Sequence, residues 1–424
     1  MAETKPKTDK KKVKEDIDDI FSQLISEQNS VSPEAAVMGT DMFSIVKMWI
    51  PTGSMTLDTI LANDYGGGWP CGRVVELYGP ESIGKSSLCF AGMAQAQEMG
   101  GIAIYHDVEQ AGAIAMMEAN GIDMKRLIVS RLTSIEEIFA ALEKNLNTII
   151  KTPRFHNKPV FICIDSLAQM TTDSEIEAGY ENNMNIALQK AKQIGKALRK
   201  IVPYLNQANA VLVFINQLRD DPGGNIYAGP LTPGGRALKF GASIRLEMRG
   251  RTAVKEMDSQ IKAQYEEELE SWNFATEQWK TNGKLGPKPE KPKKPGGTGV
   301  EIILGYDVTL FTEKNKVAAP KRTAEFRLMF GQGIIEEIAW FDWAKKLKII
   351  ESVNVTKGLW KFTNHPDQGE FKEGQWTELL SDVKLYKEVR DTIQKALIRP
   401  MISTSTSTED IKDLEPTEPN VIPE

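Results

Sequence analysis

One eight-residue segment constrains the fold more than any other. Residues 79–86 read GPESIGKS, which matches G-x-x-x-x-G-K-[ST], and they lie between an apolar run and the helix-forming run SLCFAGMAQAQEM. In that context the loop backbone and the helix N-terminus surround phosphate groups with N–H donors. We therefore predict a phosphate-binding loop, with Lys85 as a point charge for the β- and γ-phosphates and Ser86 as a magnesium ligand.

Four short apolar runs predict the sheet on which such a loop is built. They are RVVELY (73–78), IAIYHD (102–107), VFICID (160–165) and AVLVFIN (210–216). Helical stretches separate them, which indicates an α/β fold with a doubly wound, mostly parallel sheet. Ligands bind beyond the carboxyl ends of the strands in such sheets, so the four strand ends should meet at one edge.

Three of these strand ends carry polar side chains. Asp165 closes VFICID, where a carboxylate can hold magnesium, usually through water. Glu109 follows IAIYHD, and we favour it over the neighbouring Asp107 as the group that orients or deprotonates an attacking water. Gln217 follows the fourth run, where its amide can sense a γ-phosphate; the alternative is a plain strand-end hydrogen bond.

Two polar segments follow these strand ends. Residues 218–235 contain five glycines and three prolines without apolar periodicity. A structureless segment of that length in a compact domain is usually functional or disordered. Residues 172–186 form a second polar stretch after Asp165. We expect two mobile loops that face one direction, which would suit single-stranded DNA.

The remaining segments differ in composition from this central region. A basic lysine arm precedes a short amphipathic helix at 16–27, whose apolar stripe packs either on a neighbouring subunit or on its own core. Residues 257–297 read as an inserted helical arm with a Pro/Lys return linker. The predicted parts are an arm and oligomerisation helix (1–45), a core (46–335) with that insertion, a C-terminal unit (336–400) and an acidic disordered tail (401–424).

Composition excludes several classes of protein. No stretch of the chain approaches the roughly 20 apolar residues of a membrane span, so no membrane partner is expected. The three cysteines lack zinc spacing and predict free thiols in a reducing cytoplasm. The net charge of −6 does not indicate nucleic-acid binding, so a DNA site must be a local loop or groove.

Seven segments in order resemble those of the bacterial RecA family. They are PTGSMTLD (51–58), GRVVELYGPESIGKSS (72–87), the Asp-x-Glu at 107–109, IDSLA (164–168), VFINQLR (213–219), GGRALKFGASIRLE (234–247) and KNKVAAP (314–320). The resemblance implies a RecA-type P-loop ATPase core with an N-terminal helix and a small α+β C-terminal domain that gathers duplex DNA. It also implies a right-handed filament on DNA, with ATP at the subunit interface and Mg²⁺ as the metal.

The resemblance implies roles for individual residues. Glu109 matches the catalytic glutamate and Gln217 the γ-phosphate sensor, while Lys314 and Lys316 match lysines that reach into the neighbour's ATP site. The subunit-interface segment contains Lys239, Phe240 and Arg245. The residues expected around ATP and Mg²⁺ are Gly79, Pro80, Glu81, Ser82, Ile83, Gly84, Lys85, Ser86, Ser87, Asp165 and the aromatic Phe330.

The sequence departs from the family in the predicted base pocket. The family's adenine-stacking aromatic aligns with Met116, and its acidic partner aligns with Ala113. Looser base recognition is therefore expected.

A second departure is in 218–235, where acids stand in place of basic and apolar residues. Because acids oppose phosphate binding, DNA contacts are expected at other groups of this region. Those expected to bind DNA are Arg219, Arg236, the backbone at Gly234 and Gly235, and either Ile226 or Tyr227 as a wedge or stacking group.

Together these features predict an ATP-dependent recombinase. It would form a filament on single-stranded DNA, pair that strand with a homologous duplex and hydrolyse ATP to release it. Two alternatives are a hexameric helicase on the same core and a filament-forming accessory protein that binds ATP but scarcely hydrolyses it.

Overall fold

The computed structural model describes residues 19–20, 22–24, 26–27, 46–110, 114–178, 186–218, 235–296 and 301–398. The chain divides into two compact units, Met1–Val46 and Lys47–Glu424. In the first unit the described residues between 19 and 27 are helical, as predicted for 16–27. Ile20 and Leu24, two residues of the predicted apolar stripe of this helix, are exposed.

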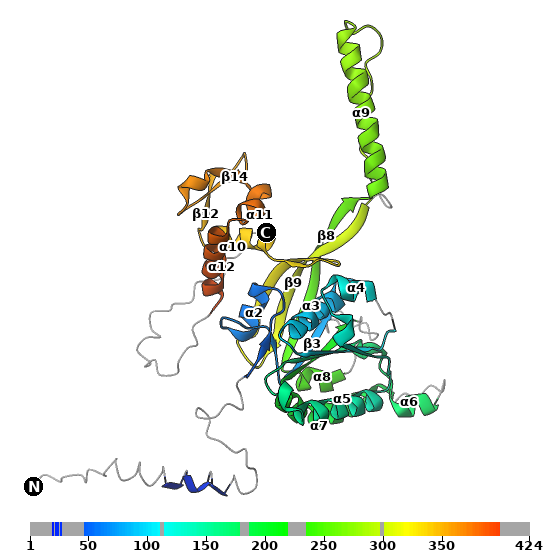
Figure 1. The fold of residues 1–424 in the computed structure, drawn as a ribbon, viewed down its shortest axis with the longest axis vertical. Helices are drawn as coiled ribbons and strands as arrows, with labels where there is room; N and C mark the ends of the chain where they lie inside the picture. The colour runs from blue at the N-terminus through cyan, green and yellow to red at the C-terminus, as the bar shows by residue number, and fades with distance from the viewer. Residues whose placement is uncertain are drawn as a thin grey trace, which may run out of the picture. The chain divides into compact units, whose positions relative to one another are not determined.

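A nine-stranded sheet lies at the centre of the described part of the second unit, in the order β11-β10-β9-β8-β3-β7-β6-β4-β5 (Figure 1). The parallel strands are β3 (Val74–Gly79), β4 (Ile102–Asp107), β5 (Leu127–Ser130), β6 (Val160–Asp165), β7 (Ala210–Gln217) and β8 (Ile244–Met257). The antiparallel strands are β9 (Glu301–Asn315), β10 (Thr323–Met329) and β11 (Gly333–Ile335).

The four strands predicted from apolar runs are confirmed as β3, β4, β6 and β7. The other five strands of the sheet were not predicted. In β10, buried side chains alternate with more exposed ones, and β5 and β11 contain no buried side chain, so these strands lack the signal of a continuous buried apolar run. A strand that is buried on one face only gives a weaker signal than one buried on both.

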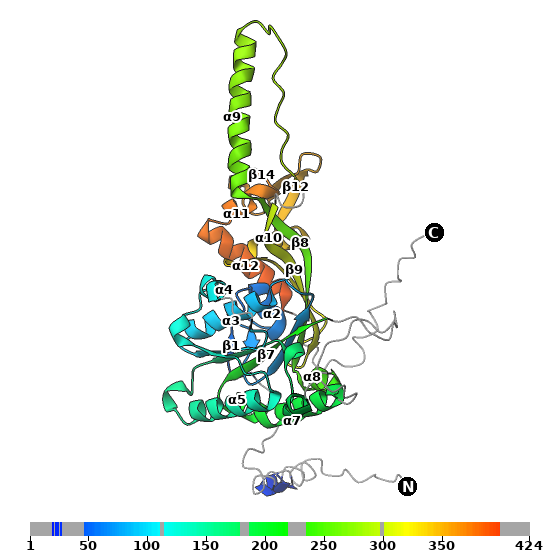
Figure 2. The ribbon, with the colours of Figure 1, turned by 90° about the vertical axis from the view of Figure 1, so that its right-hand side faces the viewer.

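Helices cover both faces of the sheet, as a doubly wound fold requires (Figures 1 and 2). On one face α3 (Lys85–Glu98) packs against Val75 and Leu77 of β3, and α4 (Ile114–Ala119) lies beside it. On the other face, α5 (Ile135–Ile150), α7 (Ile186–Gln207) and α8 (Gly235–Gly241) pack with Val74 in a second core cluster. Alternate residues of β3 thus enter two different cores.

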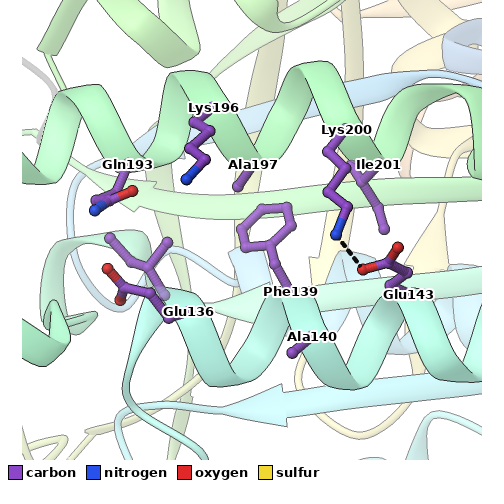
Figure 3. Close-up of a pocket in the computed structure, with 10 residues that line it drawn as sticks. Glu136, Phe139, Ala140, Glu143, Gln193, Lys196, Ala197, Lys200 and Ile201 are labelled. Atoms are coloured by element: carbon purple, nitrogen blue, oxygen red, sulfur yellow. Dashed lines mark hydrogen bonds and ion pairs between the residues drawn. The ribbon is translucent and has the colours of Figure 1, made fainter.

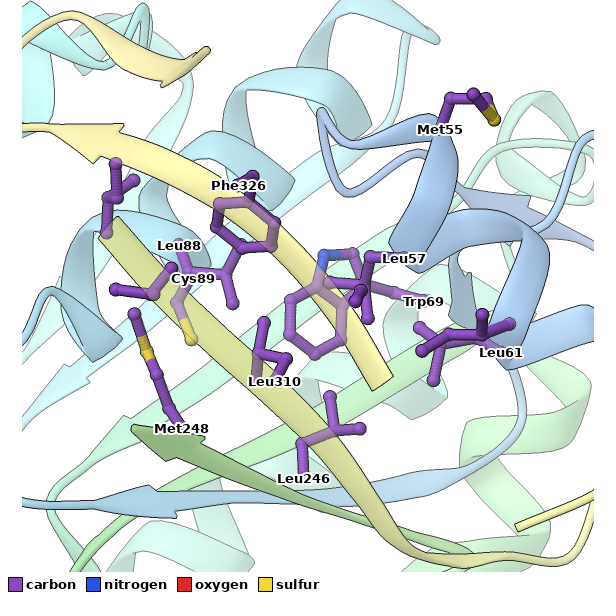
Figure 4. Close-up of a cluster of buried hydrophobic side chains, with 14 of the residues drawn as sticks. Met55, Leu57, Leu61, Trp69, Leu88, Cys89, Leu246, Met248, Leu310 and Phe326 are labelled. Atoms are coloured by element: carbon purple, nitrogen blue, oxygen red, sulfur yellow. The ribbon is translucent and has the colours of Figure 1, made fainter. Parts of the chain in front are cut away.

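The first core cluster extends past α3 to the antiparallel strands (Figure 4). Trp69 lies in it among Leu57, Leu246, Leu310 and Phe326, all nearly inaccessible to solvent. The elements that contribute here are α2 (Met55–Ala62) and the two-stranded ribbon of β1 (Trp49–Ile50) and β2 (Trp69–Pro70). The remaining helix of the core is α6 (Asp173–Ala178). The described residues also form 3-10 turns at Met124–Arg126, Pro153–Phe155, Leu167–Gln169, Pro366–Gln368 and Glu373–Gln375.

The C-terminal part contains a small antiparallel sheet and three helices. Its elements are α10 (Glu337–Lys346), β12 (Ile350–Asn354), β13 (Leu359–Phe362), β14 (Glu370–Lys372), α11 (Trp376–Leu379) and α12 (Val383–Leu397). Glu336 connects it to the core, because this buried carboxylate accepts hydrogen bonds from Ser54 Oγ and from the first backbone amides of α2 at 2.6–2.7 Å.

The insertion forms a separate arm. Helix α9 (Ser259–Thr281) follows β8 directly, and residues 282–296 return along it without helix or strand (Figures 1 and 2). The tryptophans of α9 pack against this return chain, since the Trp272 indole donates to Pro289 O.

Two observations on the described residues concern membrane spans and cysteines. None of the helices there is long and apolar enough to cross a bilayer. The three cysteines are buried and free, as predicted.

Candidate nucleotide site

The phosphate-binding loop connects β3 to α3. β3 ends at Gly79 and α3 begins at Lys85, so the loop lies at the carboxyl edge of the sheet. Gly84 caps the helix with φ +96°, and a Cβ there would lie 2.2 Å from Leu328 Cδ2. Only glycine fits this position, which explains the second glycine of the motif. Ser82 also adopts a positive φ of 58°, which turns the loop tightly.

Lys85 is fixed at the start of the helix. Its Nζ donates to Gly79 O at 3.1 Å and also to Pro80 O. Burial lowers the pKa of Lys85, although Asp165 and Glu109 oppose that shift by favouring the charged form. The ammonium therefore lies at the base of the loop and close to two carboxylates.

Ser86 and Asp165 lie side by side, as a shared metal ligand set requires. Ser86 Oγ donates to Asp165 Oδ2 at 2.6 Å, and Tyr105 OH donates to the same oxygen at 3.1 Å. Burial raises the pKa of Asp165, while the Ser86 hydroxyl opposes that shift. A hydroxyl and a carboxylate are both hard oxygen donors, so the pair fits Mg²⁺ bound through few protein ligands plus phosphate oxygens and water.

Glu109 and Gln217 meet across two strand ends. Gln217 Nε2 donates to Glu109 Oε1 at 3.3 Å. Both side chains line the same pocket as Lys85, Ser86 and Asp165. Asp107, the competing candidate, is 1% exposed and is not among the residues that line this pocket.

The pocket has a volume of about 700 Å³, and its outer wall comes from the antiparallel strands. Ile303 and Tyr306 of β9 form that wall together with Phe330, whose ring meets Tyr306 edge-on at 5.9 Å. Met116 lines the pocket and accepts a weak hydrogen bond from Ser87 Oγ at 3.5 Å. Ala113 lies outside the described residues.

Four lining residues were missed from sequence: Gln169, Ile215, Ile303 and Tyr306. The last two lie on β9, a strand that we did not predict. Conversely, Ile83 was expected around the nucleotide, but its side chain is 7% exposed and packs in the hydrophobic core. The expectation concerned the loop backbone and stays a prediction for Ile83; Gly79 and Pro80 direct their carbonyl oxygens to Lys85.

The residues expected to act across a subunit interface lie away from this pocket. Lys314 Nζ donates to Lys239 O at 2.8 Å and to Phe240 O at 3.1 Å, at the end of α8. Lys316 pairs through its backbone N–H with Ser243 O, beside the start of β3. Phe240 is 67% exposed, although it is a large apolar side chain.

Arg245, expected at the subunit interface, is instead an internal residue. It is 4% exposed and forms ion pairs with Glu76 and Glu313 of its own chain, with its guanidinium 4.7 Å from the Tyr78 ring centroid. Because two carboxylates and an aromatic ring surround it, its side chain has little surface left for a neighbour. The expectation for Arg245 is therefore corrected.

The predicted DNA loops are described only in part. Arg219, Ile226, Tyr227 and Gly234 lie outside the described residues, whereas Gly235 and Arg236 begin helix α8. In the second loop, residues 173–178 form helix α6, so the expectation of a loop there is wrong. Thr172 and Glu175 cap this helix reciprocally at 3.2 and 3.4 Å.

A second concavity lies between α5 and α7 (Figure 3). It measures about 190 Å³ and is lined largely by Phe139, Ala197, Ile201 and the aliphatic parts of longer side chains. Its charged groups include the Lys200–Glu143 ion pair at 2.6 Å. Glu136 and Lys196 also line this groove, which contains no phosphate-binding loop or strand-end carboxylate of the kind found at the edge of the sheet.

The fold and this site define a class of protein: a P-loop nucleotide-binding protein with a mostly parallel α/β sheet. The sequence matches the RecA N-terminal domain over residues 27–269. It is 33% identical to Protein RecA of Sulfurimonas denitrificans over 86% of this chain and 89% of that protein. It is 34% identical to Protein RecA of Helicobacter hepaticus (82% and 84%) and 31% identical to that of Bacteroides thetaiotaomicron (85% and 91%). The chain belongs to the RecA family.

Proposed function

We propose that this chain is an ATP-dependent recombinase that forms helical filaments on single-stranded DNA and pairs the bound strand with a homologous duplex. Membership of the RecA family supports this function. The observation that carries it is the contact between Gln217 and Glu109 at 3.3 Å. Glu109 lies in the nucleotide pocket, and Gln217 directly precedes the segment 218–235. The contact therefore connects the pocket to that segment.

Each pocket residue has a chemical role in this proposal. Lys85 places a positive charge against the β- and γ-phosphates, and Ser86 and Asp165 hold Mg²⁺. When bound, Mg²⁺ neutralises charge on the phosphate oxygens. Glu109 orients or deprotonates the water that attacks the γ-phosphate.

Gln217 couples the nucleotide to DNA in this proposal. Its Nε2 donates to Glu109 and can instead donate to a γ-phosphate oxygen. Because residue 218 follows directly, a movement of Gln217 repositions the start of the loop at 218–235. ATP binding thus favours the loop conformation that grips DNA, and hydrolysis releases it.

The two lysines at 314 and 316 act on the ATP of a neighbouring subunit. Lys314 is bound to the end of α8 and is not among the residues that line the pocket of its own chain. A contribution to phosphate chemistry therefore requires a second copy of the chain. Lysines there would offset negative charge that develops on the transferred phosphoryl group.

The test is ATP turnover by the full chain with and without single-stranded DNA. We expect DNA to stimulate turnover, Lys85→Ala to abolish it, and the exposed-lysine control Lys262→Ala to retain it. Indifference of the parent chain to DNA would contradict the proposed function. Undiminished turnover in Lys85→Ala would show that the hydrolytic site lies elsewhere.

A further inference from the structure

The return chain of the arm, residues 286–296, packs on α9 with a period of three. Pro289, Pro292 and Pro295 are half-buried, and the residues between them are exposed. Three residues per turn is the repeat of a polyproline II helix. The prolines thus form one row toward α9, and the other two rows face solvent.

Two indole hydrogen bonds fix this extended chain along the helix. Trp279 Nε1 donates to Gly286 O at 3.0 Å, and Trp272 Nε1 donates to Pro289 O at 3.1 Å. The two tryptophans are separated by about 10 Å of helix rise, and three polyproline residues span about 9 Å. Because these lengths match, the chain is held extended and loses little further conformational entropy when it binds a partner.

The exposed rows of this strand are strongly basic. Lys288, Lys291 and Lys294 recur every third residue, which sets them about 9 Å apart on one row. Lys293 lies on the next row, where Glu290 is the one acid of the segment. None of the four lysines forms an ion pair with a described carboxylate. Lys291 Nζ lies 5.5 Å from the Trp272 ring centroid, a cation–π distance.

Four of the five glutamates of α9 lie on the side away from the return chain, and the fifth, Glu268, lies about 40° from Trp272 around the helix. The half-buried residues of α9, among them Tyr265, Leu269 and Trp272, mark the face toward the return chain. At 100° per residue, four exposed glutamates point away from Trp272. They are Glu266, Glu267, Glu270 and Glu277. The arm therefore separates its charges, with the lysines on the strand and these carboxylates behind it.

We propose that the lysine strand, defined as Lys288, Lys291, Lys293 and Lys294, binds the phosphate backbone of DNA outside the segments 172–186 and 218–235. This inference rests on the proposed function. The strand fits phosphates better than a protein surface, because between Pro289 and Pro295 it exposes only lysine and glutamate. Protein interfaces depend on buried aromatic or aliphatic anchors, whereas backbone binding depends on spaced cationic charge.

The test is the salt dependence of DNA binding by the full chain, measured by fluorescence anisotropy on a labelled duplex and on its single strand. Changing all four lysines to Gln should reduce the slope of log K against log[salt] by about 2 to 4 units on the preferred DNA form. The matched variant with Arg at the same positions should keep the parent slope. A variant with Gln at the four α9 glutamates should not reduce it.

Unchanged slopes on both DNA forms would overturn the proposal. Unchanged slopes together with lost binding to polyglutamate would assign the strand to an acidic protein and also overturn it. The proposed function is tested separately by DNA-stimulated ATP turnover in the parent chain. DNA-stimulated turnover together with an unaltered salt slope would therefore contradict the proposed role of the lysine strand and leave the proposed function intact.

Discussion

Arg245→Met tests whether this arginine is an internal or an interface residue. Its side chain is 5% exposed and that of its partner Glu76 is 1% exposed. Asn216 Nδ2 also donates to Glu76, at 3.0 Å. Methionine fills a similar volume without charge, so the substitution leaves the Glu76 carboxylate buried without its cation.

The size of the effect follows from that buried carboxylate. Removing one partner of a buried ion pair costs about 3–5 kcal/mol. Glu313, the second partner, is 27% exposed and can turn toward water, so Glu76 accounts for most of the loss. The double variant Arg245→Met/Glu76→Gln should recover part of the stability, because Gln keeps an acceptor for Asn216 without a buried charge.

The assay is urea unfolding at several protein concentrations. An internal role predicts a loss in the free energy of unfolding that is independent of protein concentration and smaller in the double variant. A loss of less than about 1 kcal/mol would refute the reasoning, since surface changes have effects of that size. A loss that grows with protein concentration would also refute it, because that dependence indicates an interface.

Three further predictions concern the pocket, pH and the arm. Glu109→Gln should retain binding of a fluorescent ATP analogue but slow ATP turnover at least about 100-fold, since general base catalysis contributes that much. Turnover equal to that of the parent chain would contradict the role of Glu109 as the group that activates water. Burial lowers the pKa of His106 to about 4, and neither ring nitrogen has a hydrogen-bond partner among the described residues. As the pH falls, His106 is therefore protonated in the unfolded state before it is protonated in the folded state. Stability should therefore fall as pH drops from about 6.5 to 4, by about 3 kcal/mol, and His106→Leu should lose less over that range in urea titrations. Replacing 259–296 by a short Gly/Ser turn should leave ATP binding and the far-ultraviolet circular dichroism of the core intact, because the arm packs on itself; an insoluble product would place it in the core.

The parts of the site that could be predicted from sequence are those with local signals. The loop at 79–86 specifies its own backbone conformation, the apolar run of β6 ends at Asp165, and that of β4 ends two residues before Glu109. Because parallel strands deliver their carboxyl ends to one edge, these residues could be brought together without coordinates. The structure places them in one pocket.

The parts that were missed depend on long-range packing. Tyr306 enters the pocket from β9, which follows a long insertion and alternates buried with exposed residues. Arg245 has a carboxylate partner on a different strand, 169 residues away in sequence, so its burial could not be deduced locally. Helix α6 had a signal that was overlooked, since T-x-x-E at 172–175 is a capping box.

The central claim is that nucleotide bound between copies of this chain controls its assembly on DNA. Electron microscopy of the full chain with single-stranded DNA, with and without a non-hydrolysable ATP analogue, tests it most directly. The account predicts long helical filaments with the analogue and few without it. Closed rings, or the same assembly in both conditions, would contradict it.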